Sequence, residues 1–105
     1  IAAEHAVTLY AHNDTDAAGH REDVAGAVAA LERVDAFLGG VVDALPADAL
    51  LVVASDHGNV EDVGGGHTLT PVPVIAVGRG RELLAGRVRD LTHVTPALLG
   101  LLGIE

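Results

Sequence analysis

The chain has 105 residues and no cysteine, so a disulfide framework and a thiolate metal site are both excluded. Six basic residues against fifteen acidic ones give a net charge of −9, which argues against nucleic acid or an anionic membrane as the main partner. Half of the residues are hydrophobic but no apolar run is long enough to cross a membrane, which indicates one globular domain or part of one.

The first elements predicted along the chain are a strand and a long helix. Residues 6–11 favour a short buried strand because they include Val, Thr, Leu and Tyr. The polar residues 12–20 are predicted to form a loop. From Arg21 a helical period begins, and its apolar face holds Val24, Val28, Leu31, Val34 and Leu38. Gly39–Gly40 offer a break, although the helix could continue another turn before Pro46 ends it.

Two more strands and a closing helix follow. Residues 49–54 form a continuous apolar run, which is typical of a parallel strand covered on both faces. Residues 72–77 predict a strand whose prolines lie near its start or at a sheet edge. Residues 92–103 predict a short helix. The order of elements indicates an α/β sandwich whose sheet is at least partly parallel, with the helices flanking it.

Polar side chains follow the first two predicted strands. Asp16 and His20 come after the first strand, and Asp56 and His57 come after the second. If those strands are parallel, both pairs emerge at one edge of the sheet, where ligands of such folds bind. His67 follows three glycines on the loop that enters the third strand.

Imidazoles and carboxylates of this kind are suitable ligands for zinc and manganese. Two ions about 3.5–4 Å apart clamp the attacking and leaving oxygens of a phosphoryl transfer. The ions would also supply local positive charge to bind a phosphate, which a chain with a net charge of −9 otherwise repels.

Three motifs resemble segments of the alkaline phosphatase superfamily. "TDAAGHRED" resembles its Asp-x-x-x-Gly-His segment, and "VVASDHGNVED" resembles its Asp-His-Gly segment. "GHTLTPVPVIAVG" resembles the His-Thr-x-x-Pro-Val-Pro segment of its cofactor-independent phosphoglycerate mutase branch. "GHREDVAGAVAALERVD" is also similar to phosphopentomutases, and "LTHVTPALLGLLGIE" resembles the helix that closes these domains. The resemblance runs from about Val7 to Glu105.

The resemblance implies a role for each matching residue. Asp16, His20 and His67 would bind one metal ion, and Asp56 and His57 would bind a second, with manganese or zinc as the metal. The family's Ser or Thr nucleophile and a further aspartate have no match, so the catalytic residue is unknown. We therefore expect residues 1–105 to be the carboxyl-terminal part of a single catalytic domain that is inactive without the part upstream. Its fold would be a three-layer α/β/α sandwich with a mostly parallel sheet.

The implied function is a cytoplasmic, metal-dependent phosphomutase or phosphatase that acts on a phosphorylated small molecule. Neither nucleic acid nor a membrane is an expected partner. Two alternatives remain open at this point. The chain could be a non-catalytic metal-binding module of the same fold, or it could belong to a sulfatase or phosphodiesterase of the same superfamily.

Some polar residues near the motifs have two possible roles. Asn59 and Glu61 could orient the ligands through hydrogen bonds, or they could be solvated loop residues. Ser55 and Thr15 each precede a candidate ligand, but a hydroxyl in a turn favours bonds to the local backbone over a role as nucleophile. The segment 79–90 holds four of the six basic residues and is expected to be solvated surface.

Overall fold

The computed structural model describes residues 4–104, which divide into two compact units. The central unit spans Asn13–Arg79, and the terminal unit combines Ile1–His12 with Gly80–Glu105. Every candidate ligand lies in the central unit, so the site is described within that unit alone. Among the described residues, no helix combines the length and the apolar character that a membrane span requires.

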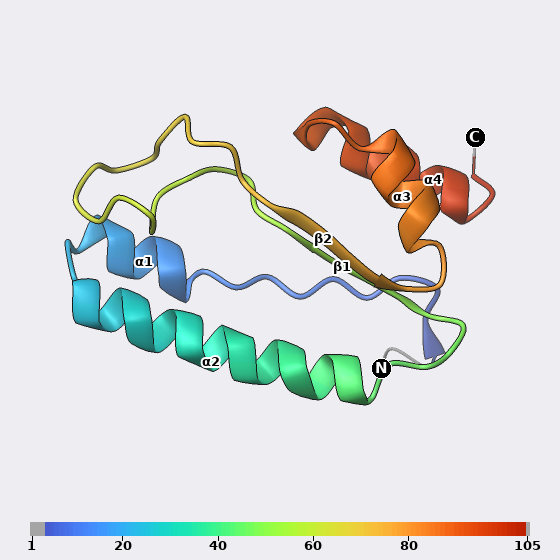
Figure 1. Ribbon diagram of the computed structural model, residues 1–105, viewed down its shortest axis with the longest axis horizontal. Helices are drawn as coiled ribbons and strands as arrows, with labels where there is room; N and C mark the ends of the chain where they lie inside the picture. Colours follow the sequence, from blue (N-terminus) through green and yellow to red (C-terminus); the bar gives the residue numbers. More distant parts are fainter. Residues whose placement is uncertain (1–3, 105) are drawn as a thin grey trace. The chain divides into compact units, whose positions relative to one another are not determined.

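The central unit begins with two helices that contact each other (Figure 1). Helix α1 spans Asp14–His20 and helix α2 spans Val24–Asp43. Asp23 caps α2, because its carboxylate accepts a hydrogen bond of 2.8 Å from the Gly26 amide. The turn between the helices holds Glu22 at φ 56, and no other non-glycine residue in the described range has a positive φ.

Helix α1 lies where the sequence predicted a loop, so that prediction was wrong. Asp14 and Asp16 occupy its first turn, where carboxylates complement the helix dipole, and His20 occupies its last turn. The alanines between them are strong helix formers. The segment was predicted to be a loop because it is polar, but its acidic residues and its histidine lie at the two ends of a helix.

The buried face of α2 differs from the predicted one. Ala27 and Ala30 are 4% and 1% exposed, whereas the predicted core residues Val24, Val28 and Leu31 are exposed. The residues that α1 buries, Ala18 and Gly19, are equally small. Small side chains let two helices approach closely, so the contact forms at the alanines and leaves the larger side chains outside. Of the two alternatives left open at Gly39–Gly40, the continued helix is the one formed, because α2 extends to Asp43.

Two of the predicted strands are confirmed, with bounds that differ slightly. Strand β1 spans Leu50–Ala54 and strand β2 spans Val74–Gly78. They pair antiparallel, with Leu50 opposite Gly78 and Ala54 opposite Val74. The prediction of a mostly parallel sheet is therefore wrong for these strands. A parallel pair needs a long crossover, usually a helix, whereas the loop 55–73 between them contains no helix and leads the chain straight back.

The third predicted strand, residues 6–11, is not formed. These residues are irregular, and Val7, Leu9 and Tyr10 are largely exposed. A strand exists through its ladder of hydrogen bonds, and the sheet found in residues 4–104 consists of β1 and β2 only. The described part of the chain is thus an α/β structure with a two-stranded antiparallel sheet, and the expected three layers are not seen in it.

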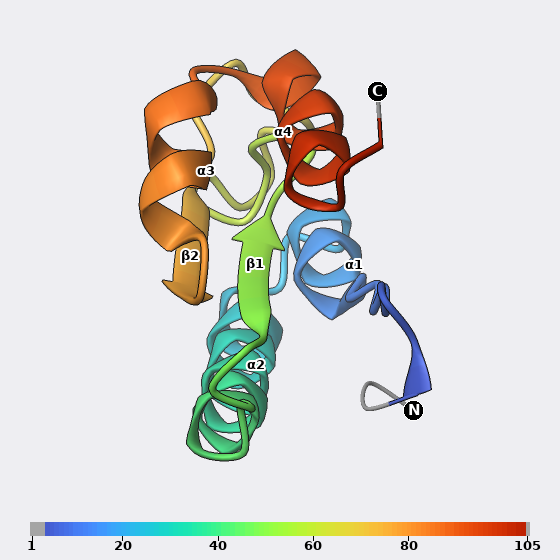
Figure 2. The same cartoon turned by 90° about the vertical axis from the view of Figure 1, so that its right-hand side faces the viewer.

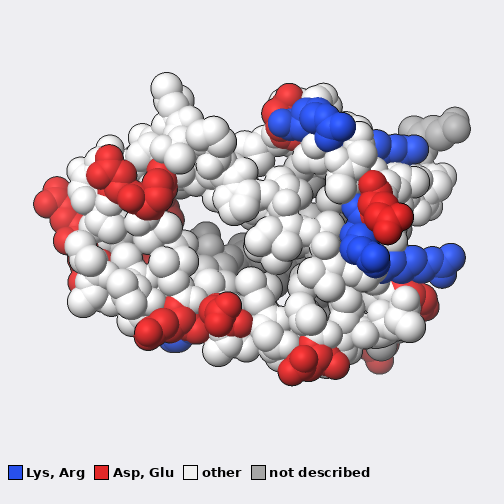
Figure 3. All heavy atoms as spheres, viewed as in Figure 1, with Lys and Arg blue, Asp and Glu red and all other residues white. Residues whose placement is uncertain are grey.

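The terminal unit holds helix α3 (Arg81–Arg87), a 3₁₀ turn (Leu91–His93) and helix α4 (Val94–Leu101). Helices α3 and α4 lie side by side and bury Leu84 and Ala97 (Figure 2). The closing helix was predicted, whereas α3 was missed within a charged segment. Most arginines on the face shown in Figure 3 gather over α3 and α4.

Candidate metal centre

Asp16 is the centre of a cluster of imidazoles. Its Oδ1 atom lies 3.4 Å from His20 Nε2 and 3.3 Å from His67 Nε2. The two Nε2 atoms are themselves 3.0 Å apart. Asp16 and His20 share one face of α1 at a spacing of four residues, and His67 comes from the loop between β1 and β2. The structure thus brings together three residues for which the family resemblance implied a common metal ion.

The spacing of these three atoms suits a metal ion. Ligands about 2.0–2.1 Å from a tetrahedral zinc ion are separated from each other by about 3.3 Å. The three distances, 3.0, 3.3 and 3.4 Å, lie close to that value. One carboxylate oxygen and two imidazole nitrogens are also a common donor set for zinc or manganese.

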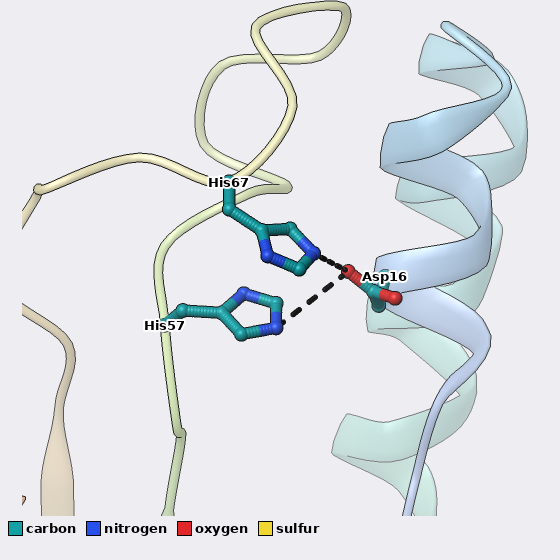
Figure 4. A group of neighbouring side chains, drawn as sticks. All are labelled: Asp16, His57 and His67. Carbon is teal, nitrogen blue, oxygen red and sulfur yellow. Dashed lines mark ion pairs between the residues drawn. The ribbon is translucent and has the colours of Figure 1, made fainter.

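His57 adds a second imidazole from the same loop. Its ring stacks on the ring of His67, with centroids 3.6 Å apart and planes inclined by 22°. Figure 4 shows both rings turning a nitrogen toward Asp16. The Nε2 of His57 lies 3.9 Å from Asp16 Oδ1, and the ligand atoms of these three residues all fall within 4.8 Å of one another.

Asp56 lies at the open side of the cluster. Its Oδ2 atom is 3.6 Å from His57 Nε2, and its side chain is 87% exposed. The side chains of His20 and His67 are about half exposed, so the cluster is open to solvent. The carboxylate of Asp56 is thus close to His57 alone among the three imidazoles, whereas that of Asp16 is close to all three.

Asp16 is ionised at neutral pH. Partial burial raises the pKa of its carboxyl, but a hydrogen bond from Asn59 and the imidazoles of His20, His67 and His57 lower it, and the net pKa is below the ordinary value. A carboxylate must be deprotonated to bind a metal ion. The surroundings of Asp16 therefore favour the form that can act as a ligand.

Asn59 supports Asp16 from the loop. It is 4% exposed, and its Nδ2 donates to Asp16 Oδ1 at 2.5 Å and to the Asp16 carbonyl at 3.4 Å. Gly19 makes room for this amide, because a Cβ at that position would lie 1.8 Å from Asn59 Oδ1. Sequence reasoning left the role of Asn59 open and missed Gly19, although the glycine stands directly before His20 in the motif.

The loop between β1 and β2 is held at several points. Gly58 and Thr68 form an isolated antiparallel bridge, and Thr68 donates its amide to the Gly58 carbonyl at 2.8 Å. Glu61 accepts hydrogen bonds from the Asn59 amide and the Thr68 hydroxyl. Beyond the bridge the loop tip contains a turn in which Gly65 donates to the Asp62 carbonyl at 2.9 Å. Ser55 donates to the His57 carbonyl at 3.0 Å, a local backbone bond as expected.

Comparison with known proteins gave one family and a set of named relatives. A family model described as the metalloenzyme superfamily matches residues 2–105. A 2,3-bisphosphoglycerate-independent phosphoglycerate mutase of Cereibacter sphaeroides is 44% identical over 100 residues, which cover 85% of this chain and 19% of that protein. Proteins of the same name from Syntrophotalea carbinolica and Desulforudis audaxviator are 41% and 37% identical, over 86% and 93% of this chain.

The chain spans about a fifth of the length of these curated relatives. No solved structure matched it significantly.

Proposed function

The chain belongs to the metalloenzyme superfamily, and we propose that it forms part of a metal-dependent phosphomutase with its metal ions at the Asp16 cluster. The relatives named as phosphoglycerate mutases support a phosphoglycerate as the substrate. In this proposal residues 1–105 are the carboxyl-terminal part of a cytoplasmic enzyme's catalytic domain. The domain has an alkaline-phosphatase-like fold, to which the two-stranded sheet contributes.

The observation that carries the proposal is the triangle of donor atoms from Asp16, His20 and His67. Its edges of 3.0–3.4 Å suit one ion bound by all three residues. Without an ion, the same spacing requires ion pairs of both imidazoles with Asp16 and a hydrogen bond between the two rings. Two imidazole nitrogens can approach to 3.0 Å without an ion only if one ring donates a proton to the other.

A second ion at Asp56 and His57 is part of the proposal. The Asp56 Oδ2 atom lies 3.6 Å from His57 Nε2 at the open side of the cluster, so these two residues can share an ion. The Nε2 atoms of His57 and His67 both approach Asp16 Oδ1, at 3.9 and 3.3 Å, so the two ions would be neighbours, as in two-metal sites whose ions are about 3.5–4 Å apart. In this arrangement His67 serves the first ion and His57 serves the second.

In this proposal the residues of this chain hold the ions. The side-chain amide of Asn59 and the adjacent imidazoles lower the pKa of Asp16, which favours the carboxylate form that binds a metal. When bound, two divalent ions would neutralise the phosphate and activate the nucleophile that attacks it. The nucleophile is not assigned to any residue of this chain, and the hydroxyl of Ser55 is engaged with its own loop.

Metal titration of the protein tests the proposal. Protein stripped with EDTA is titrated with Mn²⁺ and Zn²⁺ by calorimetry, as are His67→Ala and His20→Ala. Each substitution removes a ligand, so we expect affinity to fall by at least the roughly 10–100-fold loss typical of changing a ligand's hydrogen-bond partner. His93→Ala is the matched control, because His93 lies in the terminal unit.

The proposal is wrong if the unaltered protein binds neither ion, or if His20→Ala and His67→Ala bind as tightly as the control. Phosphoglycerate interconversion, measured on the whole protein that carries the chain, should disappear with EDTA and return when manganese or zinc is added.

A further inference from the structure

We propose that Glu61 is a positioning residue whose carboxylate ties together the two arms of the loop between β1 and β2, and so sets the separation of His57 and His67. The importance of that separation rests on the proposed function, because the two rings would serve neighbouring ions. The clamp itself is a property of the loop and can be tested without any ion.

The two arms meet at the Gly58–Thr68 bridge. His57 and His67 each stand one residue before a bridge partner, so their side chains leave the same face as diagonal neighbours. Diagonal neighbours in an antiparallel pair are about 7–8 Å apart at the backbone, a gap that aromatic side chains can close. The rings of His57 and His67 do close it, with centroids 3.6 Å apart.

A single bridge gives little resistance to sliding or opening, and Glu61 reinforces it. One carboxylate oxygen of Glu61 accepts a hydrogen bond of 2.7 Å from the backbone amide of Asn59, on the first arm. The other oxygen accepts from the Thr68 hydroxyl on the second arm. Because hydrogen bonds to a carboxylate are stronger than neutral ones, this link is the strongest polar connection described between the arms.

The neighbourhood is shaped for this clamp. A Cβ on Gly58 would lie 2.2 Å from the Thr68 hydroxyl oxygen and 2.5 Å from a carboxylate oxygen of Glu61, so only glycine leaves room for it. The Thr70 amide donates to the Thr68 hydroxyl oxygen at 3.3 Å, which leaves the hydroxyl hydrogen free to point at Glu61. The Thr68 hydroxyl and nearby backbone amides hold the pKa of Glu61 below its ordinary value.

The clamp also reaches the other half of the cluster. Glu61 accepts a hydrogen bond from the backbone amide of Asn59. The side-chain amide of Asn59 in turn donates to the Asp16 carboxylate. Glu61 thus fixes the imidazole pair through Thr68 and the Asp16 carboxylate through Asn59. It acts through these residues and contacts none of the candidate ligands in any described hydrogen bond or ion pair.

The test uses paired substitutions at both ends of the clamp. Thr68→Val removes the hydroxyl with little change of shape, and Thr68→Ser keeps it. Glu61→Gln replaces one of the two accepting oxygens by an NH₂ group, which cannot accept a hydrogen bond from the Asn59 backbone amide or the Thr68 hydroxyl. Asp62→Asn removes a charge next to Glu61 and is the matched control.

Two quantities are measured on folded protein: the ring-proton chemical shifts of His57 and His67 in metal-free samples, and the affinity for Zn²⁺ and Mn²⁺. Stacked rings shift each other's proton resonances, so an opened pair moves toward the shifts of free imidazole. We expect Thr68→Val and Glu61→Gln to show that movement and to bind the ions about 10–100-fold more weakly. Thr68→Ser and Asp62→Asn should match the unaltered protein in both quantities.

Unchanged ring shifts in Thr68→Val and Glu61→Gln would overturn the clamp, and so would a Thr68→Ser variant as disturbed as Thr68→Val. If Thr68→Val does not fold, Glu61→Gln and Thr68→Ser decide the same question. Metal binding by the unaltered protein with no effect of the substitutions would reject the clamp and leave the proposed function standing. Shifted rings in a protein that binds no ion would support the clamp and reject the proposed function.

Discussion

Asn59 lies 43 residues from Asp16 in the chain, yet its side-chain amide donates to the Asp16 carboxylate at 2.5 Å. The amide is almost fully buried, whereas the carboxylate side chain is 40% exposed. A residue of the loop after β1 therefore orients a carboxylate of α1. This contact joins the two segments that supply the candidate ligands.

Replacing Asn59 should destabilise the central unit. Asn59→Ala deletes a charge-assisted hydrogen bond, which we expect to lower the free energy of unfolding by about 1–3 kcal/mol. Urea unfolding followed by circular dichroism measures the change. Asn13→Ala is the control, because Asn13 begins α1 without a side-chain capping bond and should change stability by less than about 0.5 kcal/mol. Equal unfolding midpoints for the two variants would contradict this expectation.

Replacing Glu22 by glycine should stabilise the protein. Glu22 has φ 56, and the left-handed conformation costs a residue with a Cβ about 1–2 kcal/mol relative to glycine. Glu22→Gly should therefore raise the free energy of unfolding by about 1 kcal/mol. Glu32→Gly, in the interior of α2, should lower it by about 1 kcal/mol. The prediction fails if both substitutions change the urea midpoint in the same direction.

Glycine to alanine substitutions should have opposite effects on stability in helix α2, at Gly39 and Gly40, and in helix α1, at Gly19. A Cβ on Gly39 or Gly40 meets nothing within 4 Å, so alanine should stabilise α2 by about 1 kcal/mol at each position. The same change at Gly19 would displace Asn59 from Asp16 and should be destabilising. Thermal unfolding of the three variants measures the difference, and a Gly19→Ala protein as stable as Gly39→Ala would contradict the close contact.

Stability should fall in acid. Hydrogen bonds from Thr68 lower the pKa of Glu61, and those from Thr92 lower the pKa of Asp90. A lowered pKa means that the folded state binds fewer protons than the unfolded state. The resulting stabilisation is complete above the ordinary carboxylate pKa of about 4 and is lost as pH falls through the lower folded value.

Urea unfolding between about pH 3 and pH 6 tests the acid effect. Thr92→Val removes the side-chain bond to Asp90 and should flatten the dependence, whereas Thr95→Val, in the adjacent helix α4, should leave it unchanged. A dependence that is equally steep in both variants would exclude Asp90 as a contributor.

The strands and the long helix could be predicted because their apolar runs are continuous or periodic. Residues 49–54 and 72–77 gave β1 and β2, since a buried strand needs little besides apolar and β-branched side chains. The face of α2 could not be predicted the same way. Its contact depends on the small residues of α1, and a scale of hydrophobicity ranks Val24 above Ala27.

The convergence of Asp16, His20 and His67 was expected, but the route to it was not. The sequence placed Asp16 and His20 at one edge of a partly parallel sheet, and the family resemblance joined His67 to them. The structure instead joins helix α1 to a loop between antiparallel strands. The ligand roles themselves stay predictions. Glu61 and Asn59 could not be assigned from the sequence, because their roles depend on contacts with Thr68 and Asp16 that no local pattern specifies.

The Gly58–Thr68 bridge separates the turn at Asp62–Gly65 from the rest of the loop. Residues added within that turn lengthen a segment already closed by the bridge. Doubling the length of such a segment costs only about 0.6 kcal/mol of chain entropy. The turn is thus a natural insertion point, where a peptide tag or fluorophore could report on the cluster while the ring pair beneath it keeps its geometry.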